Sequence, residues 1–554
     1  TLRTIGASRR QILASVILEA FAVGLAAAVV GLFGGLGLAV GLNKLFEALS
    51  LDLPTAGIVF ATRTVVVSLL IGTVVTVLAG LFPAIRATRV PPIAAVREGA
   101  ELPKSRLAPF APYIALVTIA LSVTLLAFAM FRDALGTAER LLSIAGGVLL
   151  LFLGVAMVSS RLVRPLAALV GRPATWIGGT AGRLAKGNST RNTGRTAATA
   201  AALMIGIALV TFVAVLANGM KASNRDAIES QVKADYVVTS QDGFTPFVAG
   251  AGDELSRSQA ADLVTPVRSE LGALNGKAQY VTGIVPDAIE KVYRFDWKEG
   301  SDDVLADLGR DGAIVAKDFA EDNNLDVGSR LTLRTPSDTT AALQVKGIYE
   351  PPPFYPILGA VSISEDTFDS LYDRPRNQFV FANVPGSPTA ATTDSLTDAV
   401  ASFPDAKVQT RGEWIDEQDE DFNQFLSMLY VLLALSVVVS LFGMVNTLVL
   451  SVFERTRELG MLRAVGMTRR QVRRMIRHES VITALIGAAL GLPLGIFLAL
   501  LVTRALAQFD VQFAIPVSLL ATFAVIAVVI GVLAAILPAR RAARLNVLQA
   551  LQYE

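Results

Sequence analysis

Cysteine is absent from the 554-residue chain, and histidine occurs once, as His478. The first absence excludes disulfides, thiol catalysis and cysteine-ligated zinc, and the second argues strongly against a histidine-based metal site or catalytic triad. Charged residues are also scarce, at 17% against 53% hydrophobic residues, and the mean hydropathy is +0.54. This balance predicts a protein that crosses a membrane several times.

Several apolar stretches are long enough to cross a hydrocarbon core, which takes about 20 residues of helix. We expect eight spans, near 19–42, 62–85, 112–131, 141–160, 197–218, 424–451, 480–504 and 515–537. No charged residue lies in the middle of these stretches, which argues against a proton or ion relay inside the membrane. The loops rich in lysine and arginine, 86–111 and 161–196 among them, all fall on one side. The positive-inside rule makes that side the cytoplasm and places both termini there.

The stretch from Glu454 to Glu479, called the elbow below, is rich in arginine and lies between two spans. Its first part predicts an amphipathic helix, because apolar residues recur at every third position. Gly466 should interrupt that helix, and the Thr468–Gln471 spacing of a capping box should start a second one. The elbow arginines could serve only to orient the protein in the membrane. The apolar stripe and the capping box favour docking of a partner instead.

The elbow occurs twice, because the start of the chain repeats it at an offset of 460 residues. Ser8 takes the place of Thr468 and keeps the capping box, and residues 82–89 repeat 537–544 at an offset of 455. This internal repeat predicts two related membrane units. Since the chain begins inside a repeated motif and without methionine, we expect the natural protein to carry a similar unit upstream, for ten spans in all.

Residues 220–421 differ in composition from the rest of the chain. They contain 35 Asp and Glu against 18 Lys and Arg, so their net charge is −17, and the topology places them outside the cytoplasm. Alternating apolar residues predict strands at 235–239, 312–316, 330–333, 343–349 and 360–363. A helix is predicted over 253–271. We therefore expect a compact α+β domain that is entered and left through neighbouring helical stalks.

Three motifs carry a resemblance to a known family: the elbow ERTRELGMLRAVGMTRRQ, the closing LPARRAARLNVLQAL, and GAIVAKDFAEDNNLDVGSRLTL at 312–333. Together with the repeat they resemble FtsX-like permeases of the MacB type, the membrane subunits of certain ABC transporters. The resemblance implies a multi-pass α-helical membrane protein with two FtsX-like repeats and an α+β extracytoplasmic domain of the MacB-type periplasmic core kind. The segments it implies are the end of a first repeat (1–100), two linking spans with a basic loop (101–195), a span (196–219), the extracytoplasmic domain (220–421) and a second repeat (422–554).

The resemblance further implies that the elbow is a coupling helix, over 454–474, for a separate nucleotide-binding subunit. The implied coupling residues are Glu454, Arg455, Glu458, Leu459, Leu462, Arg463, Val465, Gly466 and Thr468, with Leu2, Arg3, Gly6 and Ser8 in the first copy. Leu459, Leu462 and Val465 would form the apolar anchor, and Glu458 and Arg463 would make charged contacts at its rim. The residues expected along the stalks are Lys221, Arg225, Asp416 and Asp419.

The expected partners are two copies of an ABC ATPase, membrane lipid and an extracytoplasmic lipoprotein or hydrolase, but no nucleic acid. We expect no catalytic residue, cofactor or metal on this chain, since ATP and Mg²⁺ would be bound by the ATPase. Gly182–Ser189 lacks the lysine that a phosphate-binding loop requires. The implied location is a bacterial cytoplasmic membrane. Two functions stay open: transport of an amphiphile such as a lipid, lipoprotein, peptide or antibiotic, and signalling that activates a cell-wall hydrolase. A passive scaffold is disfavoured by the paired elbows.

Small residues within the spans predict close helix packing. Gly487, Gly491 and Gly495 recur at every fourth position, and Ala27, Gly31 and Gly35 hold the matching places in the first copy. The acidic residues of 413–421 are interpreted as a solvated stalk face, because their spacing does not fit a calcium loop.

Overall fold

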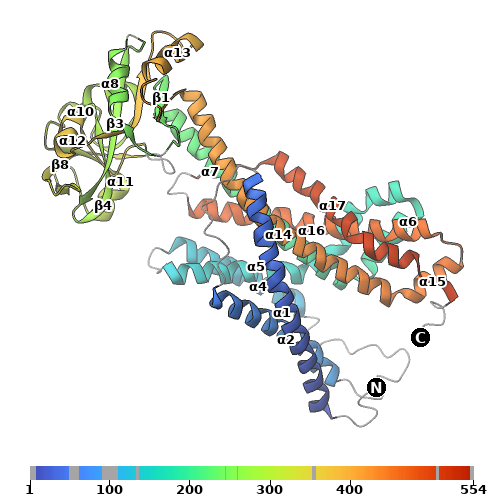
Figure 1. Ribbon diagram of the computed structural model, residues 1–554. Helices are drawn as coiled ribbons and strands as arrows, with labels where there is room; N and C mark the ends of the chain where they lie inside the picture. Colours follow the sequence, from blue (N-terminus) through green and yellow to red (C-terminus); the bar gives the residue numbers. More distant parts are fainter. Residues whose placement is uncertain are drawn as a thin grey trace. The chain divides into compact units, whose positions relative to one another are not determined.

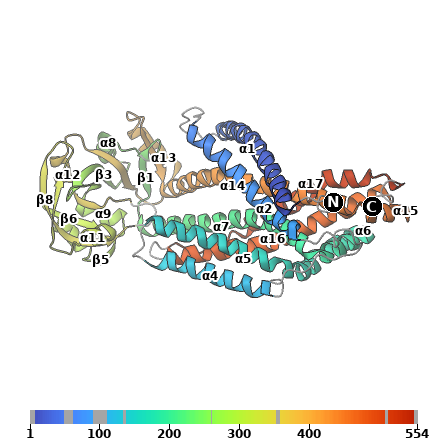
Figure 2. The same ribbon diagram turned by 90° about the horizontal axis from the view of Figure 1, so that it is seen from below.

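The computed structural model describes residues 8–48, 61–89, 110–132, 137–243, 245–258, 260–351, 357–506 and 511–548. The chain divides into two compact units, residues 1–114 and 115–554. Within the described residues, eight helices are long and apolar enough to cross a membrane, and each overlaps one of the eight predicted spans. Figures 1 and 2 show the elements of each unit.

The first unit is a helical hairpin of α1 (Arg9–Ala48) and α2 (Thr62–Arg89). The two helices approach closely at Gly24 and Gly72. A Cβ atom on Gly24 would lie 2.9 Å from Thr76 Cβ, and one on Gly72 would lie 2.8 Å from Ala28 Cβ. The predicted capping box at Ser8 is present, since Ser8 N donates to Gln11 Oε1 at 2.9 Å and Gln11 N donates to Ser8 Oγ at 3.3 Å. Sequence spacing therefore identified the start of α1 correctly.

The second unit contains the other six span-length helices, together with α6 and α15, which are not among the candidate spans. They are α4 (Ala111–Phe131), α5 (Thr137–Val170), α6 (Arg172–Arg191), α7 (Thr193–Gln231), α14 (Arg411–Glu454), α15 (Thr456–Ala464), α16 (Arg469–Ala505) and α17 (Val517–Ala543). Most of the predicted basic loop 161–196 is helical, so the expectation of a loop there was wrong. The length of the apolar runs had marked only the apolar centres of the helices, whereas their polar ends continue the same backbone hydrogen bonding.

Glycines set the packing between α7 and α16. Cβ atoms placed on Gly487, Gly491 and Gly495 would lie 2.9, 2.8 and 2.5 Å from the carbonyl oxygens of Ala200, Met204 and Ala208 respectively. The packing interpretation of this four-residue repeat is confirmed. Among the described residues, Cβ atoms on Gly31 and Gly35 would meet nothing within 4 Å, so the close packing predicted at these places of the first copy is not seen there. Gly24 and Gly72 bring those helices together instead.

Residues between α7 and α14 fold into the expected α+β domain, built on one sheet. Its main strand order is β11-β1-β10-β3-β4-β9-β6-β8-β5, with β2 paired to β10 and β7 paired to both β3 and β8. The strands are β1 (Tyr236–Ser240), β2 (Phe247–Val248), β3 (Leu263–Leu274), β4 (Lys277–Ile284), β5 (Asp296–Glu299), β6 (Gly312–Ala316), β7 (Arg330–Arg334), β8 (Thr340–Glu350), β9 (Val361–Ser364), β10 (Arg376–Asn383) and β11 (Ala406–Thr410). The short helices of the domain are α8 (Gly250–Arg257), α9 (Pro286–Val292), α10 (Asp303–Ala306), α11 (Lys317–Asn323), α12 (Glu365–Leu371) and α13 (Ala390–Ala399).

The five strands predicted from alternation are all present as β1, β6, β7, β8 and β9. The helix predicted over 253–271 is wrong beyond Arg257, where α8 ends and β3 soon follows. The β-branched residues Val264 and Val267 favour a strand, and β3 pairs with β10 on one side and β4 on the other. These long-range pairs override the local helical period.

Candidate coupling site at the elbow

The elbow has the two-helix form that its sequence predicts. Helix α15 ends at Ala464, and Gly466 follows with a φ of 115°, a left-handed conformation that side chains rarely adopt. Thr468 then caps α16: Thr468 N donates to Gln471 Oε1 at 2.8 Å, and Gln471 N donates to Thr468 Oγ1 at 3.3 Å. The turn between the helices is thus fixed by one glycine and one capping box.

One face of α15 packs inside the chain. Leu459 is only 2% exposed and belongs to a buried cluster with Val452, Met475 and Ile476. The prediction that Leu459 forms part of an outward anchor is therefore wrong. The three-residue spacing of the stripe does not keep Leu459 on the same face as Val465, which lies just beyond the last helical turn. Leu459 instead holds α15 against α14 and α16.

The opposite side of the elbow is open and apolar. Val465 is 89% exposed and Met461 is 46% exposed, while Leu462 is half-buried. Such exposed apolar side chains beside a fixed turn can be buried by a partner. The surface available for docking therefore centres on Val465 and Met461, and Met461 was missed by the sequence analysis.

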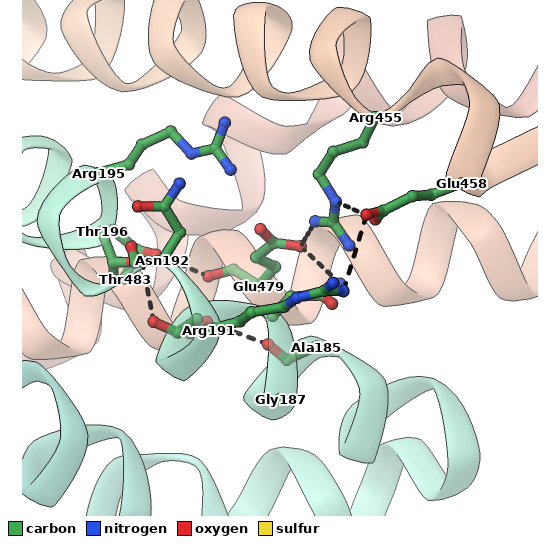
Figure 3. Close-up of polar contacts among 12 residues, drawn as sticks. Ala185, Gly187, Arg191, Asn192, Arg195, Thr196, Arg455, Glu458, Glu479 and Thr483 are labelled. Carbon is green, nitrogen blue, oxygen red and sulfur yellow. Dashed lines mark hydrogen bonds and ion pairs between the residues drawn. The ribbon is translucent and has the colours of Figure 1, made fainter. Parts of the chain in front are cut away.

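Charged side chains fasten the elbow from within (Figure 3). Arg455 donates to Glu458 at 3.0 Å and lies 3.5 Å from Glu479 on α16. Asn188 Nδ2 of α6 donates to the same Glu479 at 3.3 Å. The side chains of Arg455 and Glu479 are 17% and 15% exposed, so their ion pair is shielded from solvent. Through Glu458 of α15, Glu479 of α16 and Asn188 of α6, these contacts connect three helices.

Two further ion pairs connect the elbow to α6 and α7. Arg191 lies 3.7 Å from Glu458, and Arg195 pairs with Glu454. Sequence analysis missed Asn188, Arg191 and Arg195, because nothing in the linear pattern placed them beside the elbow. The available signal for the site was Glu479, whose counterpart Glu19 occupies the same place in the first copy.

Glu458 and Arg463, the two residues predicted to make charged contacts with a partner, also make contacts within the chain. Glu458 is held by Arg455 and Arg191, and Arg463 donates to the backbone carbonyl of Leu545. Both residues thus make contacts within the chain, while the Glu458 side chain stays 42% exposed. Their contact with a partner remains a prediction. In the first copy, Leu2, Arg3 and Gly6 lie outside the described residues.

The predicted stalk residues meet where α7 and α14 lie side by side. Arg225 lies 3.1 Å from Asp416 and 2.8 Å from Asp419, and Lys221 lies 3.5 Å from Asp419. These contacts lie toward the domain ends of the two helices (Figure 1). The structure thus brings the four side chains together; their role in motion stays a prediction.

Both stalk helices enter the core of the domain. Ile228 of α7 and Trp414 of α14 are buried in one cluster with residues of the sheet, and Arg411 donates to the carbonyl of Val232 at 2.9 Å. No loop separates Thr410, the last residue of β11, from the start of α14. The helices are therefore continuous with the domain, as Figure 2 also shows.

Within the described residues, no group of three or more acidic or histidine side chains is placed to hold a metal ion. The elbow itself combines an exposed apolar turn at Val465, ion pairs that involve Arg455 and Glu458, and the long helices α14 and α16 on either side of it.

Comparison with known proteins matches most of these elements. The FtsX-like permease C-terminal family matches residues 1–92 and 430–547, and the MacB-like periplasmic core domain family matches residues 196–399. A Mycobacterium tuberculosis protein described as "Uncharacterized ABC transporter permease protein Rv0987" is 24% identical over 510 residues, which are 85% of this chain and 56% of that protein. The chain thus spans about half the length of this curated relative.

Two solved structures resemble the domain at low similarity. One is a domain of a permease protein from Porphyromonas gingivalis, at 14% identity, and the other is the extracellular domain of the noncanonic ABC-type transporter YknZ from Gram-positive bacteria, at 12%. Each match covers 32% of this chain. The matched part is 86% of the Porphyromonas gingivalis domain and 98% of the YknZ domain, and both TM-scores are 0.23.

Membrane-spanning helices, a glycine-turned elbow and an α+β domain mounted on two helices define a multi-pass membrane protein of the permease class with an extracytoplasmic domain. The matched segments identify its parts: residues 1–92 and 430–547 match the FtsX-like permease C-terminal family, and residues 196–399, between them, match the MacB-like periplasmic core domain family.

Proposed function

We propose that the chain is the permease subunit of an ABC transporter in a bacterial cytoplasmic membrane, and that it transmits motion from a separate ATPase to its extracytoplasmic domain. By this proposal the elbow receives one ATPase copy, the repeated motif at the chain's start receives a second, and both termini are cytoplasmic. The driven motion exports or extracts an amphiphile, such as a lipid, lipoprotein, peptide or antibiotic.

The observation that carries the proposal is the unbroken path from the elbow to the domain. Helix α14 has 44 residues and α7 has 39, so at 1.5 Å per residue they extend roughly 66 and 58 Å. They are joined by Arg195–Glu454 at the elbow and by Arg225–Asp419 near the domain. A displacement at the elbow would therefore be passed along stiff helices.

The exposed face of the elbow supports docking. Burying an aliphatic side chain such as Val465 stabilises an interface by about 1.5–3 kcal/mol, whereas an exposed ion pair contributes at most about 1 kcal/mol. Glu458 already pairs with Arg455, and Arg463 already donates to the carbonyl of Leu545, so apolar contact is the main attraction left for a partner. The buried Leu459 would hold α15 in its position when the ATPase exerts force on it.

Co-purification of the full chain with an ABC ATPase encoded beside it tests the proposal. Val465→Asp should abolish recovery of the ATPase, while Val327→Asp, a matched change at an exposed position of the domain, should leave recovery unchanged. Full recovery with Val465→Asp would remove the elbow from the docking surface. Stimulation of ATP hydrolysis by candidate amphiphiles, compared with stimulation by a cell-wall hydrolase, then distinguishes transport from signalling.

A further inference from the structure

A cavity of about 840 Å³ lies between α6, the start of α16 and α17, on a side of the elbow that the coupling proposal does not use. Four arginines line it: Arg470, Arg473, Arg474 and Arg477. Their spacing of three and four residues puts them on one face of α16. The cavity therefore has a strongly basic wall at its cytoplasmic end.

The same helical face becomes apolar toward the membrane. Val481 and Leu485 follow Arg477 at four-residue intervals, and Val528 and Val532 of α17 line the cavity beside them. Leu485 lies eight positions after Arg477, which is a rise of roughly 12 Å along the helix. One continuous cavity thus offers cations at one end and aliphatic side chains at the other.

The positive charges have no internal counterpart. In the described residues none of the four arginines forms an ion pair with a carboxylate; Arg474 donates to the backbone carbonyl of Ile177 at 3.1 Å and Arg473 to that of Arg469 at 3.5 Å. The sequences of α6 and α17 contain no Asp or Glu. His478 also lines the cavity, and its buried Nε2 finds no hydrogen-bond partner within the described ranges. The arginine donors call for an anionic group from outside the chain.

Helix α6 lines the cavity and has the features of a helix that lies at a membrane surface. Trp176 and Ile177 are 89% and 62% exposed on this basic helix, a composition typical of helices that lie in the lipid interface. Gly179 kinks α6 with a φ of 54° and a ψ of −131°. Gly178 presses against α16, since a Cβ there would lie 2.7 Å from His478 Nε2.

From this arrangement we infer that the cavity binds one anionic phospholipid of the cytoplasmic leaflet. The arginines bind its phosphate, and Val481, Leu485, Val528 and Val532 contact an acyl chain. The inference depends on the membrane topology and not on ATPase docking, since Val465 takes no part in the cavity. The bound lipid would join α6 to α16 and α17 at the base of the stalk helices.

Native mass spectrometry of the full detergent-purified chain tests this inference. Phosphatidylglycerol should bind at least tenfold more tightly than phosphatidylcholine with the same acyl chains. Each membrane-adjacent arginine raises affinity for anionic lipid about fivefold, so Arg473→Gln with Arg477→Gln should weaken phosphatidylglycerol on the order of 30-fold. The control, Arg457→Gln with Arg469→Gln, removes the same charge from exposed positions outside the cavity and should change affinity less than about threefold.

A second variant tests the acyl contact. Val532→Trp fills the apolar end and should weaken phosphatidylglycerol while leaving the arginines in place. Displacement of the lipid by inorganic phosphate, with Val532→Trp having no effect, would show a free-phosphate site and overturn the inference. Equal losses in the cavity and control variants would also overturn it. A third outcome would overturn the inference as well: the cavity variant could keep the lipid but lose the ATPase. The arginines would then contact a protein and not a lipid.

Discussion

Arg225 of α7 and Asp419 of α14 lie 2.8 Å apart and join the two helices on which the extracytoplasmic domain is mounted. Asp419 is 14% exposed and also accepts Lys221 at 3.5 Å, so one carboxylate holds two cations. Just beyond this point, Ile228 and Trp414 are buried in the domain core, so the domain ends of both helices are built into that core. A lever of this kind can pass on a displacement that a flexible linker would absorb.

The stalk contact should have a measurable coupling energy. In a double-mutant cycle of Arg225→Met and Asp419→Ala, we expect about 1 kcal/mol of coupling in the thermal unfolding of the full chain, because Arg225 remains 42% exposed. The pair Arg334–Asp338, 63% and 73% exposed, serves as the control and should show almost none. Equal coupling in both pairs would mean that the stalk contact is an ordinary surface ion pair.

The two faces of the elbow should respond differently to truncation. Leu459→Ala removes a buried side chain and should destabilise the chain by about 2–5 kcal/mol. Val465→Ala should leave thermal stability almost unchanged and weaken ATPase recovery, because the side chain is exposed. Unfolding scans and co-purification, run on the same two proteins, check both statements. A stability loss in Val465→Ala matching that of Leu459→Ala would show that the exposed face had been assigned wrongly.

The glycine contacts between α7 and α16 should not accept a methyl group. Gly495→Ala would place Cβ 2.5 Å from the carbonyl oxygen of Ala208, so the helices must separate, at about 1–3 kcal/mol. Gly443→Ala on α14 is the control, because its Cβ would lie 4.0 Å from Ala202 Cβ. Thermal unfolding should show a loss for the first change and none for the second.

The domain should lose one contribution to stability in acid. Burial by itself raises the pKa of Glu350, but the nearby Lys298, at 2.5 Å, and Lys317, at 3.1 Å, outweigh it and hold the pKa below its usual 4.5. A lowered folded-state pKa stabilises the protein above pH 4.5 and loses this effect as the pH falls through the folded value. Glu350→Gln should therefore lower the free energy of unfolding at pH 7 by at most about 1 kcal/mol. The difference in free energy of unfolding between Glu350→Gln and the unchanged protein should disappear as the pH is lowered. A difference that stays constant with pH would show that the ion pairs of Glu350 contribute nothing.

The parts of the fold that could be predicted are those governed by local pattern. Apolar length gave the spans, and the Thr468–Gln471 spacing gave the start of α16, because a cap involves only neighbouring residues. Strand β3 was mistaken for helix since its pairing with β10 and β4 is not visible locally. The same limit applies to the elbow: sequence located it, but only three-dimensional packing shows that Leu459 faces inward and that Arg195 meets Glu454.

The central claim is that the stalk helices carry motion from the elbow to the domain, and the cysteine-free chain suits a spin-label test. Labels at exposed Ala61, before α2, and exposed Ala391, in α13, report the distance between the first unit and the domain. In the assembled complex, double electron–electron resonance should show that ATP changes the distance between the two labels. Inserting three glycines after Gln231 and three after Thr410 should abolish the shift while ATPase recovery is retained. The same shift with the insertions in place, or no shift in the natural chain, would contradict the account.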